Sequence, residues 1–187
     1  MYKYNFTIAR KVDRLLLPIA KFFHKGLGLT PNNLSLISFI VGSAAVILVL
    51  FQKVEIALVI LLISLIFDGL DGIVARLYNL ESNRGEKLEL FFDRTNEVMI
   101  FLALVAKGYI ELRLAILAIL AILLMTTLRK RAKFDPGFKR SILFPGYFVG
   151  FALAFKVIFW VNLLGFIINM LILDYSRQRK LDAKSTQ

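Results

Sequence analysis

The stretch "LSLISFIVGSAAVILVLF" (residues 34–51) decides the fold class, because it carries no charged side chain from one end to the other. A helix that crosses the hydrocarbon core of a bilayer needs about 20 mostly apolar residues. Further apolar runs follow at residues 56–67, 98–106, 114–128, 142–155 and 157–173. They do not show the short alternation of membrane barrel strands. We therefore predict an all-α integral membrane protein with six transmembrane helices.

The composition agrees with this prediction. Of the 187 residues 58% are hydrophobic, and the mean hydropathy is +0.72. A soluble domain rarely reaches such values, because its surface must be polar. The chain has no cysteine, which excludes disulfides and thiolate metal sites. With their flanks included, we expect the helices roughly at residues 32–51, 55–77, 86–106, 112–131, 141–156 and 158–177.

The formal net charge of +11 could indicate a nucleic-acid partner, but its distribution argues against one. If the first membrane helix starts in the cytoplasm, most lysines and arginines fall on the cytoplasmic side. The outer side keeps only Lys53, Lys107, Arg113 and Lys156. This is the positive-inside bias of membrane proteins. We therefore expect a protein of the plasma (inner) membrane with both termini in the cytoplasm, contacts to membrane lipids and no nucleic-acid partner.

The N-terminal segment differs from the apolar runs. Residues 5–25 repeat apolar side chains at helical spacing, with most basic residues elsewhere on the helix. This predicts an amphipathic helix in the membrane interface, with packing on the protein as the alternative. "GLGLTPNN" (residues 26–33) then breaks the chain, and Thr30 and Pro31 are suited to start the next helix. We divide the chain into residues 1–29 (interfacial helix and linker), 30–177 (transmembrane catalytic domain) and 178–187 (cytoplasmic tail).

An acidic segment, "FDGLDGIVARLYNLESNRGEKLELFFD" (residues 67–93), lies between two apolar runs. Asp68 and Asp71 end the second predicted span, and Glu89 and Asp93 begin the third. A short loop makes these helices antiparallel neighbours, so both pairs lie at similar depth and can face each other. Four such carboxylates repel one another and are costly to desolvate. One or two divalent cations would resolve this, and oxygen ligands favour Mg²⁺ or Mn²⁺ over zinc.

An alternative is that the acids pair with nearby cations, namely Arg76, Arg84, Lys87 and Arg94. The small residues favour the metal interpretation. Gly72, Ala75 and Gly85 accompany the acids, although a glycine inside a helix costs up to about 1 kcal/mol relative to alanine. Small side chains let another group approach the backbone closely. Carboxylates, an arginine and a smooth groove together suit a phosphate or diphosphate.

The acidic segment also resembles a family signature. The residues that carry it are Asp68, Asp71, Gly72, Ala75, Arg76, Gly85, Glu89 and Asp93. They resemble the pattern D-x2-D-G-x2-A-R-x8-G-x3-D-x3-D of the CDP-alcohol phosphotransferases (CDP-alcohol phosphatidyltransferases). Seven of the eight defining positions match with the correct spacing. Glu89 departs from it, standing where the family has its third aspartate, with its carboxylate one methylene further out.

The resemblance implies a reaction of phospholipid biosynthesis. The donor would be a CDP-linked lipid, CDP-diacylglycerol or CDP-archaeol, with its diphosphate on two Mg²⁺ or Mn²⁺ ions. The hydroxyl of a small alcohol acceptor would attack the β-phosphorus, and CMP would leave. Members of the family often form homodimers.

The resemblance also assigns roles to residues. Asp68, Asp71 and Glu89 would ligate metal, and Asp93 would ligate the second ion or act as catalytic general base. The residues of the nucleotide and phosphate site would be Gly72, Ala75, Arg76 and Gly85, with Asn32 and Ser35 as weaker contacts.

A basic segment, "TTLRKRAKFDPGFKRS" (residues 126–141), is a candidate acceptor site. Its candidate ligands for a sugar or polyol phosphate are Arg129, Arg131, Lys133, Lys139 and Arg140. The alternative is topogenic charge in contact with lipid headgroups. Two other functions stay open for the whole chain: an intramembrane prenyltransferase that uses Mg-diphosphate, and a non-catalytic divalent-cation-binding protein or transporter.

Overall fold

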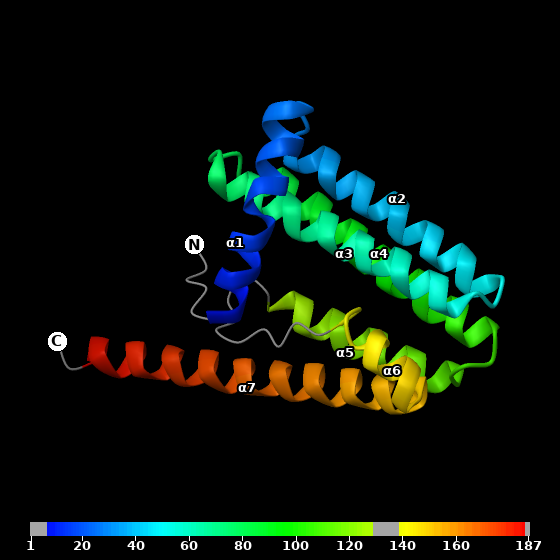
Figure 1. Cartoon of the computed structure of the whole chain (residues 1–187). Coiled ribbons are helices and arrows are strands. Elements are labelled where there is room, and N and C mark those ends of the chain that lie inside the picture. The colour runs from blue at the N-terminus through cyan, green and yellow to red at the C-terminus, as the bar shows by residue number, and fades with distance from the viewer. Residues whose placement is uncertain (1–6, 129–138, 186–187) are drawn as a thin grey trace. The chain divides into compact units, whose positions relative to one another are not determined.

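A computed structural model describes residues 7–128 and 139–185, and all regular secondary structure in these ranges is helical. The chain forms two compact units, Met1–Ala103 and Leu104–Gln187. The first unit contains α1 (Thr7–Lys21), the π-helical turn η1 (Phe22–Gly26), α2 (Pro31–Leu50), α3 (Val54–Leu77) and most of α4 (Asn83–Ala106) (Figure 1). The second contains α5 (Leu112–Thr127), α6 (Leu143–Val149) and α7 (Phe151–Ser185). The prediction of an all-α chain is confirmed, while the division at residues 30 and 178 stays a prediction.

Three helices of the described chain are long and apolar enough to cross a membrane: α2, α3 and the Phe151–Gln178 part of α7. A fourth helix, α5, is apolar but shorter. The start of α2 is as predicted, with Pro31 in the first turn and the side chain of Thr30 accepting a hydrogen bond from the Asn33 backbone N–H at 3.3 Å. The chain is therefore an integral membrane protein by the length and composition of its helices.

The amphipathic N-terminal segment is helical and packs on α3. Ala20 of α1 lies in a buried cluster with Leu70 and Val74 of α3. On other sides of the same segment Leu15 is 75% exposed and Phe22 61% exposed. The segment thus packs against α3 with one face and exposes large apolar side chains on another face.

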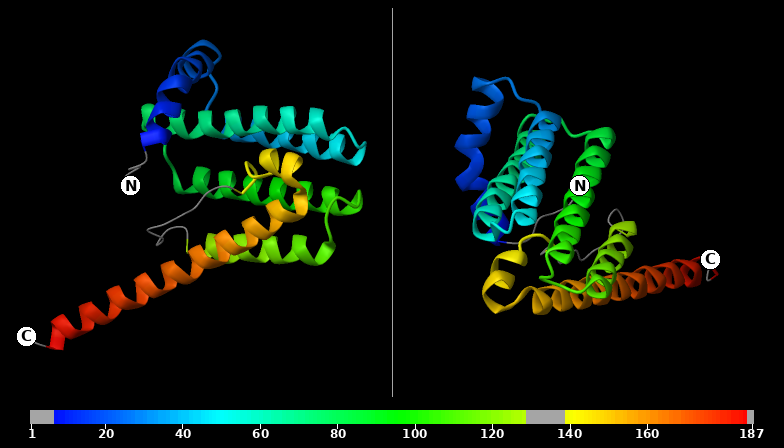
Figure 2. Two further views of the ribbon diagram at one scale, coloured as in Figure 1. Left: turned by 60° about the horizontal axis from the view of Figure 1, so that its bottom comes forward. Right: turned by 90° about the vertical axis from the view of Figure 1, so that its right-hand side faces the viewer.

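Helices α2 and α3 are joined by a buried seam of small and polar side chains, and they run side by side in Figure 2. Ser38 Oγ donates to the Ser64 carbonyl at 2.9 Å, and Ser64 Oγ donates to the Ser38 carbonyl at 2.9 Å. Such small residues let two membrane helices approach closely without leaving polar groups unpaired. The seam fixes the register of α3 against α2 and so the height of the acidic residues.

Gly42 of α2 allows α4 to approach at the side of this seam. A Cβ at Gly42 would lie 2.9 Å from Asn96 Cγ and 3.0 Å from Ser64 Oγ, and both neighbours are buried. We expect Gly42→Ala to destabilise the protein by roughly 1–3 kcal/mol, because overpacking outweighs the better helix propensity of alanine. Thermal unfolding in detergent measures the loss of stability. The control is Ala44→Val, a substitution at an exposed position of the same helix. Adding Asn96→Ala should recover part of the loss; a Gly42→Ala protein as stable as the parent would contradict the packing.

The predicted helices at residues 141–156 and 158–177 are wrong in their bounds. Instead α6 ends at Val149 after seven residues, and α7 runs without interruption for 35 residues from Phe151. Gly150 makes the break, because its φ of +101° is a conformation that side chains with a Cβ rarely adopt. Lys156, which we expected from the sequence on the outer side at the end of the helix at residues 141–156, is an exposed residue inside α7. Helix α6, about 10 Å long, cannot cross a bilayer on its own.

Candidate functional site

Three of the four predicted acidic ligands, Asp71 of α3 and Glu89 and Asp93 of α4, are near enough to act on one another electrostatically. Asp71 lies in α3 and is only 4% exposed. The two charged groups that act on it electrostatically are Glu89 and Asp93, in the first turns of α4. That the two helices turn these acidic side chains toward each other stays a prediction. Asp68, one turn earlier on α3, is half-buried and has contacts of its own.

Ser35 of α2 is bonded directly to this acidic group. Its hydroxyl donates a hydrogen bond to Asp71 Oδ2, and the Pro31 carbonyl lies 3.1 Å from the same hydroxyl. The sequence placed Ser35 only as a weak nucleotide contact. Its contact with a carboxylate 36 residues further along the chain has no signal in the sequence, because it depends on the register of α2 and α3.

The loop before α4 sets the height of Glu89 and Asp93. Ser82 caps α4, since its Oγ accepts a hydrogen bond from the Gly85 backbone N–H at 3.0 Å. A Cβ at Gly85 would lie 3.1 Å from Ser82 Oγ and 3.1 Å from Asn32 Oδ1. Gly85 is therefore the point at which the first turn of α2 approaches the first turn of α4, and Asn32 and Gly85, two residues of the predicted nucleotide site, are neighbours.

The remaining small residues lie along α3. A Cβ at Gly72 would be 3.1 Å from Arg76 Nη1, so the Arg76 guanidinium folds back over the open side of Gly72. Ala75 is half-buried one residue before Arg76. The arginine is thus held beside the helix backbone, one turn after Gly72.

A metal site stays a prediction. Within residues 7–128 and 139–185, no three or more carboxylate or imidazole side chains form a group that could hold an ion as they stand. The donors that do meet are carboxylates, which are the ligands that Mg²⁺ and Mn²⁺ prefer. The chemistry of the donor set fits a hard divalent ion, and closing the site around it would require the side chains of Glu89 and Asp93 to move toward Asp71.

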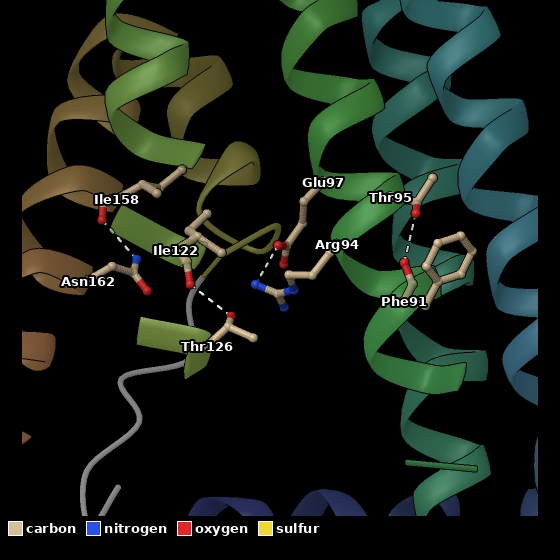
Figure 3. A network of polar contacts seen from close by, with 8 residues as sticks. All are labelled: Phe91, Arg94, Thr95, Glu97, Ile122, Thr126, Ile158 and Asn162. Carbon is tan, nitrogen blue, oxygen red and sulfur yellow. Dashed lines mark hydrogen bonds and ion pairs between the residues drawn. The ribbon is translucent and has the colours of Figure 1, made fainter. Parts of the chain in front are cut away.

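The alternative of simple ion pairs fails for three of the four basic residues. Arg94 pairs with Glu97 at 2.7 Å, one turn along α4 (Figure 3). In the part of the chain that the structure describes, Arg84 and Lys87 make no ion pair. Both instead line an open pocket of about 620 Å³ together with Asn32, Leu88 and Phe91. Sequence reasoning missed this role, although basic residues three apart with apolar residues one turn on were visible as a signal.

The predicted acceptor residues are only partly described. Arg129, Arg131 and Lys133 lie outside the described residues. In the second unit, Lys139 is half-buried and Arg140 is 5% exposed, three residues before α6. The acceptor site stays a prediction.

Comparison with known proteins agrees with the motif. A family model described as CDP-alcohol phosphatidyltransferase matches residues 28–174. An "Uncharacterized protein" of Aquifex aeolicus (strain VF5) is 33% identical over 93 residues, which cover 49% of this chain and 46% of that protein. The chain thus spans about half the length of this curated relative.

Proposed function

The chain belongs to the CDP-alcohol phosphatidyltransferase family, and from this premise we propose that it moves a substituted phosphate group from a CDP-linked lipid to an acceptor alcohol and releases CMP. The donor is CDP-diacylglycerol or CDP-archaeol, and the acceptor is a small alcohol such as a sugar or polyol phosphate. The reaction belongs to phospholipid biosynthesis.

The observation that carries the proposal is the buried carboxyl group of Asp71, on which Glu89 and Asp93 of the next helix act electrostatically. Acidic side chains inside membrane-spanning helices are costly, so their presence in such helices points to a function. Asp68, Asp71, Glu89 and Asp93 would hold Mg²⁺ or Mn²⁺, two ions in all. When bound, these ions neutralise charge on the transferred group and on the departing CMP.

The chain's own residues bind and orient the reactants. Arg76, whose guanidinium lies over Gly72, would hold a phosphate oxygen of the donor. Ala75, Gly85 and Asn32 leave room for the nucleotide. Asp93 accepts the proton of the acceptor hydroxyl, whose oxygen forms a bond to the β-phosphorus as the bond to CMP breaks.

Release of CMP from a radiolabelled CDP-lipid tests the proposal, with purified protein in liposomes and a panel of alcohols and sugar phosphates. We expect divalent-cation-dependent CMP release with at least one acceptor. Bound metal with no CMP from any acceptor would favour a non-catalytic cation-binding protein. Transfer from a labelled prenyl diphosphate would favour a prenyltransferase.

Ser35→Ala should weaken the reaction without abolishing it. A hydrogen bond to a charged group contributes about 1.5–3 kcal/mol, so CMP release should fall by roughly 10- to 100-fold, with a higher Mg²⁺ requirement. Titration of activity against Mg²⁺ measures both effects. Ser43→Ala on the same helix removes a hydroxyl that bonds to the Phe39 carbonyl instead, and it should leave the Mg²⁺ requirement unchanged. Equal Mg²⁺ curves for all three proteins would contradict the role of Ser35.

We propose that α1 lies in the interface of the plasma membrane, that α4 and α5 cross it along with the three long apolar helices, and that the acidic end of α3 faces the cytoplasm. The positive-inside bias supports this orientation. A sixth crossing would have to come from residues 128–150. Within this range, the described helix α6 is too short to cross a bilayer.

The absence of cysteine makes the orientation testable with single introduced cysteines. Lys53→Cys should react with a membrane-impermeant maleimide in intact cells. Glu81→Cys should react only after permeabilisation. The reverse pattern would put the acidic centre on the outer surface and reject the proposal.

A further inference from the structure

The open pocket at the start of α4 has two kinds of lining. Arg84 and Lys87 supply positive charge, while Leu88 and Phe91 are apolar. Asn32 of α2 supplies an amide from the facing helix. At 62% exposed, Phe91 is a large aromatic side chain at the protein surface. The pocket is thus polar toward the helix start and apolar one to two turns further on.

The pocket lies on a different face of α4 from the acidic residues. Arg84, Lys87, Leu88 and Phe91 follow the spacing of a single helix face at i, i+3, i+4 and i+7. Gly85, Glu89 and Asp93 form another face, roughly 140° round the axis at 100° per residue. A ligand held between Arg84 and Lys87 therefore lies on a different side of α4 from the acidic residues, and Asn32 is the one lining residue that the pocket shares with the proposed nucleotide site.

The charge of the pocket is uncompensated. Neither Arg84 nor Lys87 has an ion-pair partner among residues 7–128 and 139–185, and no acidic side chain lines the pocket. Two cations on adjacent turns around an open space attract a phosphate. The pocket therefore favours an anionic ligand.

The protein surface next to the pocket is lined by apolar side chains. On α2, Leu36 and Ile40 follow Asn32 at i+4 and i+8, and both are exposed. They belong to a helix apolar enough to cross a membrane, and Phe91 lies beside the pocket on α4. A ligand with a negatively charged head and a long apolar tail would match a basic pocket that is followed by an apolar surface.

We propose that this pocket binds an anionic phospholipid, with its phosphate between Arg84 and Lys87 and an acyl chain along Phe91, Leu36 and Ile40. The first turns of α2 and α4 lie where a bilayer has its headgroups if α2 spans it, which places the cations at phosphate level. The lipid stays bound beside the acidic centre and is not a substrate of it. This inference does not depend on the proposed function.

Native mass spectrometry of the full chain, released from micelles with equal phosphatidylglycerol and phosphatidylcholine, tests the site. Wild-type protein should retain phosphatidylglycerol preferentially. In Arg84→Gln/Lys87→Gln the affinity for phosphatidylglycerol should fall roughly 10- to 30-fold, since each basic residue near anionic lipid contributes about a fivefold factor. The matched variant Lys53→Gln/Lys107→Gln loses the same charge at other exposed positions and should retain the lipid.

Two competitions define the ligand. Phe91→Ala should weaken retention of long-chain phosphatidylglycerol more than that of a dihexanoyl form, as an acyl contact requires. Glycerol phosphate and CMP, each at millimolar concentration, should not displace the lipid. Retention in Arg84→Gln/Lys87→Gln, or equal loss in the matched variant, would overturn the proposal. Displacement by glycerol phosphate would show a free-phosphate site, and displacement by CMP a part of the nucleotide site, and either would also overturn it.

Discussion

Replacing Asp71 by asparagine should reduce CMP release on the order of 10³-fold while the helices remain folded. Asparagine keeps the shape of aspartate, and its amide oxygen can still accept the hydrogen bond from Ser35. It lacks the charge that attracts a cation into the centre. The loss should therefore come from the chemistry and not from unfolding.

The stability of the Asp71→Asn protein should change in an unusual direction. Without divalent cations, removing a buried charge that faces Glu89 and Asp93 relieves repulsion, so the unfolding temperature should stay equal or rise. With Mg²⁺, the wild-type protein should gain stability by mass action, and the variant should not. Thermal unfolding with and without Mg²⁺ measures this, with the exposed change Asp174→Asn as control. An equal Mg²⁺ shift in both proteins would show that Asp71 holds no ion.

Replacing Asp93 by asparagine should slow CMP release by about 10²- to 10⁴-fold, the usual contribution of a positioned general base. If Asp93 takes the acceptor's proton, kcat should fall while the KM for the CDP-lipid and the Mg²⁺ requirement stay close to those of the wild type. If it ligates the second ion instead, the Mg²⁺ requirement should rise steeply. Steady-state kinetics over a range of Mg²⁺ separates these results. Undiminished CMP release would reject both roles, and Glu81→Gln in the exposed loop is the control for charge alone.

The predicted arrangement of the acidic residues depends only on local geometry. Asp71 at the end of one helix and Glu89 and Asp93 at the start of the next are joined by a short loop, so the helices had to be antiparallel neighbours. The spacing of three and four then turned the carboxylates inward. Local rules also placed the start of α2 at Thr30 and Pro31.

What the sequence left open depended on contacts between distant segments or on a single backbone conformation. The bond from Ser35 to Asp71 requires the register of two helices. The cations Arg84 and Lys87 looked like partners for the acids, because the sequence does not show what each side of α4 faces in the folded protein. The break between α6 and α7 at Gly150 lies inside a continuous apolar stretch. Only the backbone dihedral of Gly150 marks it.

The length of α7 has a consequence for anything fused to the end of this helix. At 1.5 Å per residue its 35 residues extend for about 52 Å, while a hydrocarbon core is about 30 Å thick. If the apolar part of α7 fills the bilayer, the last turns of this helix extend into water as a rigid rod. A fluorescent reporter fused there would be held some way off the lipid surface, and energy transfer to labelled headgroups would be correspondingly weak.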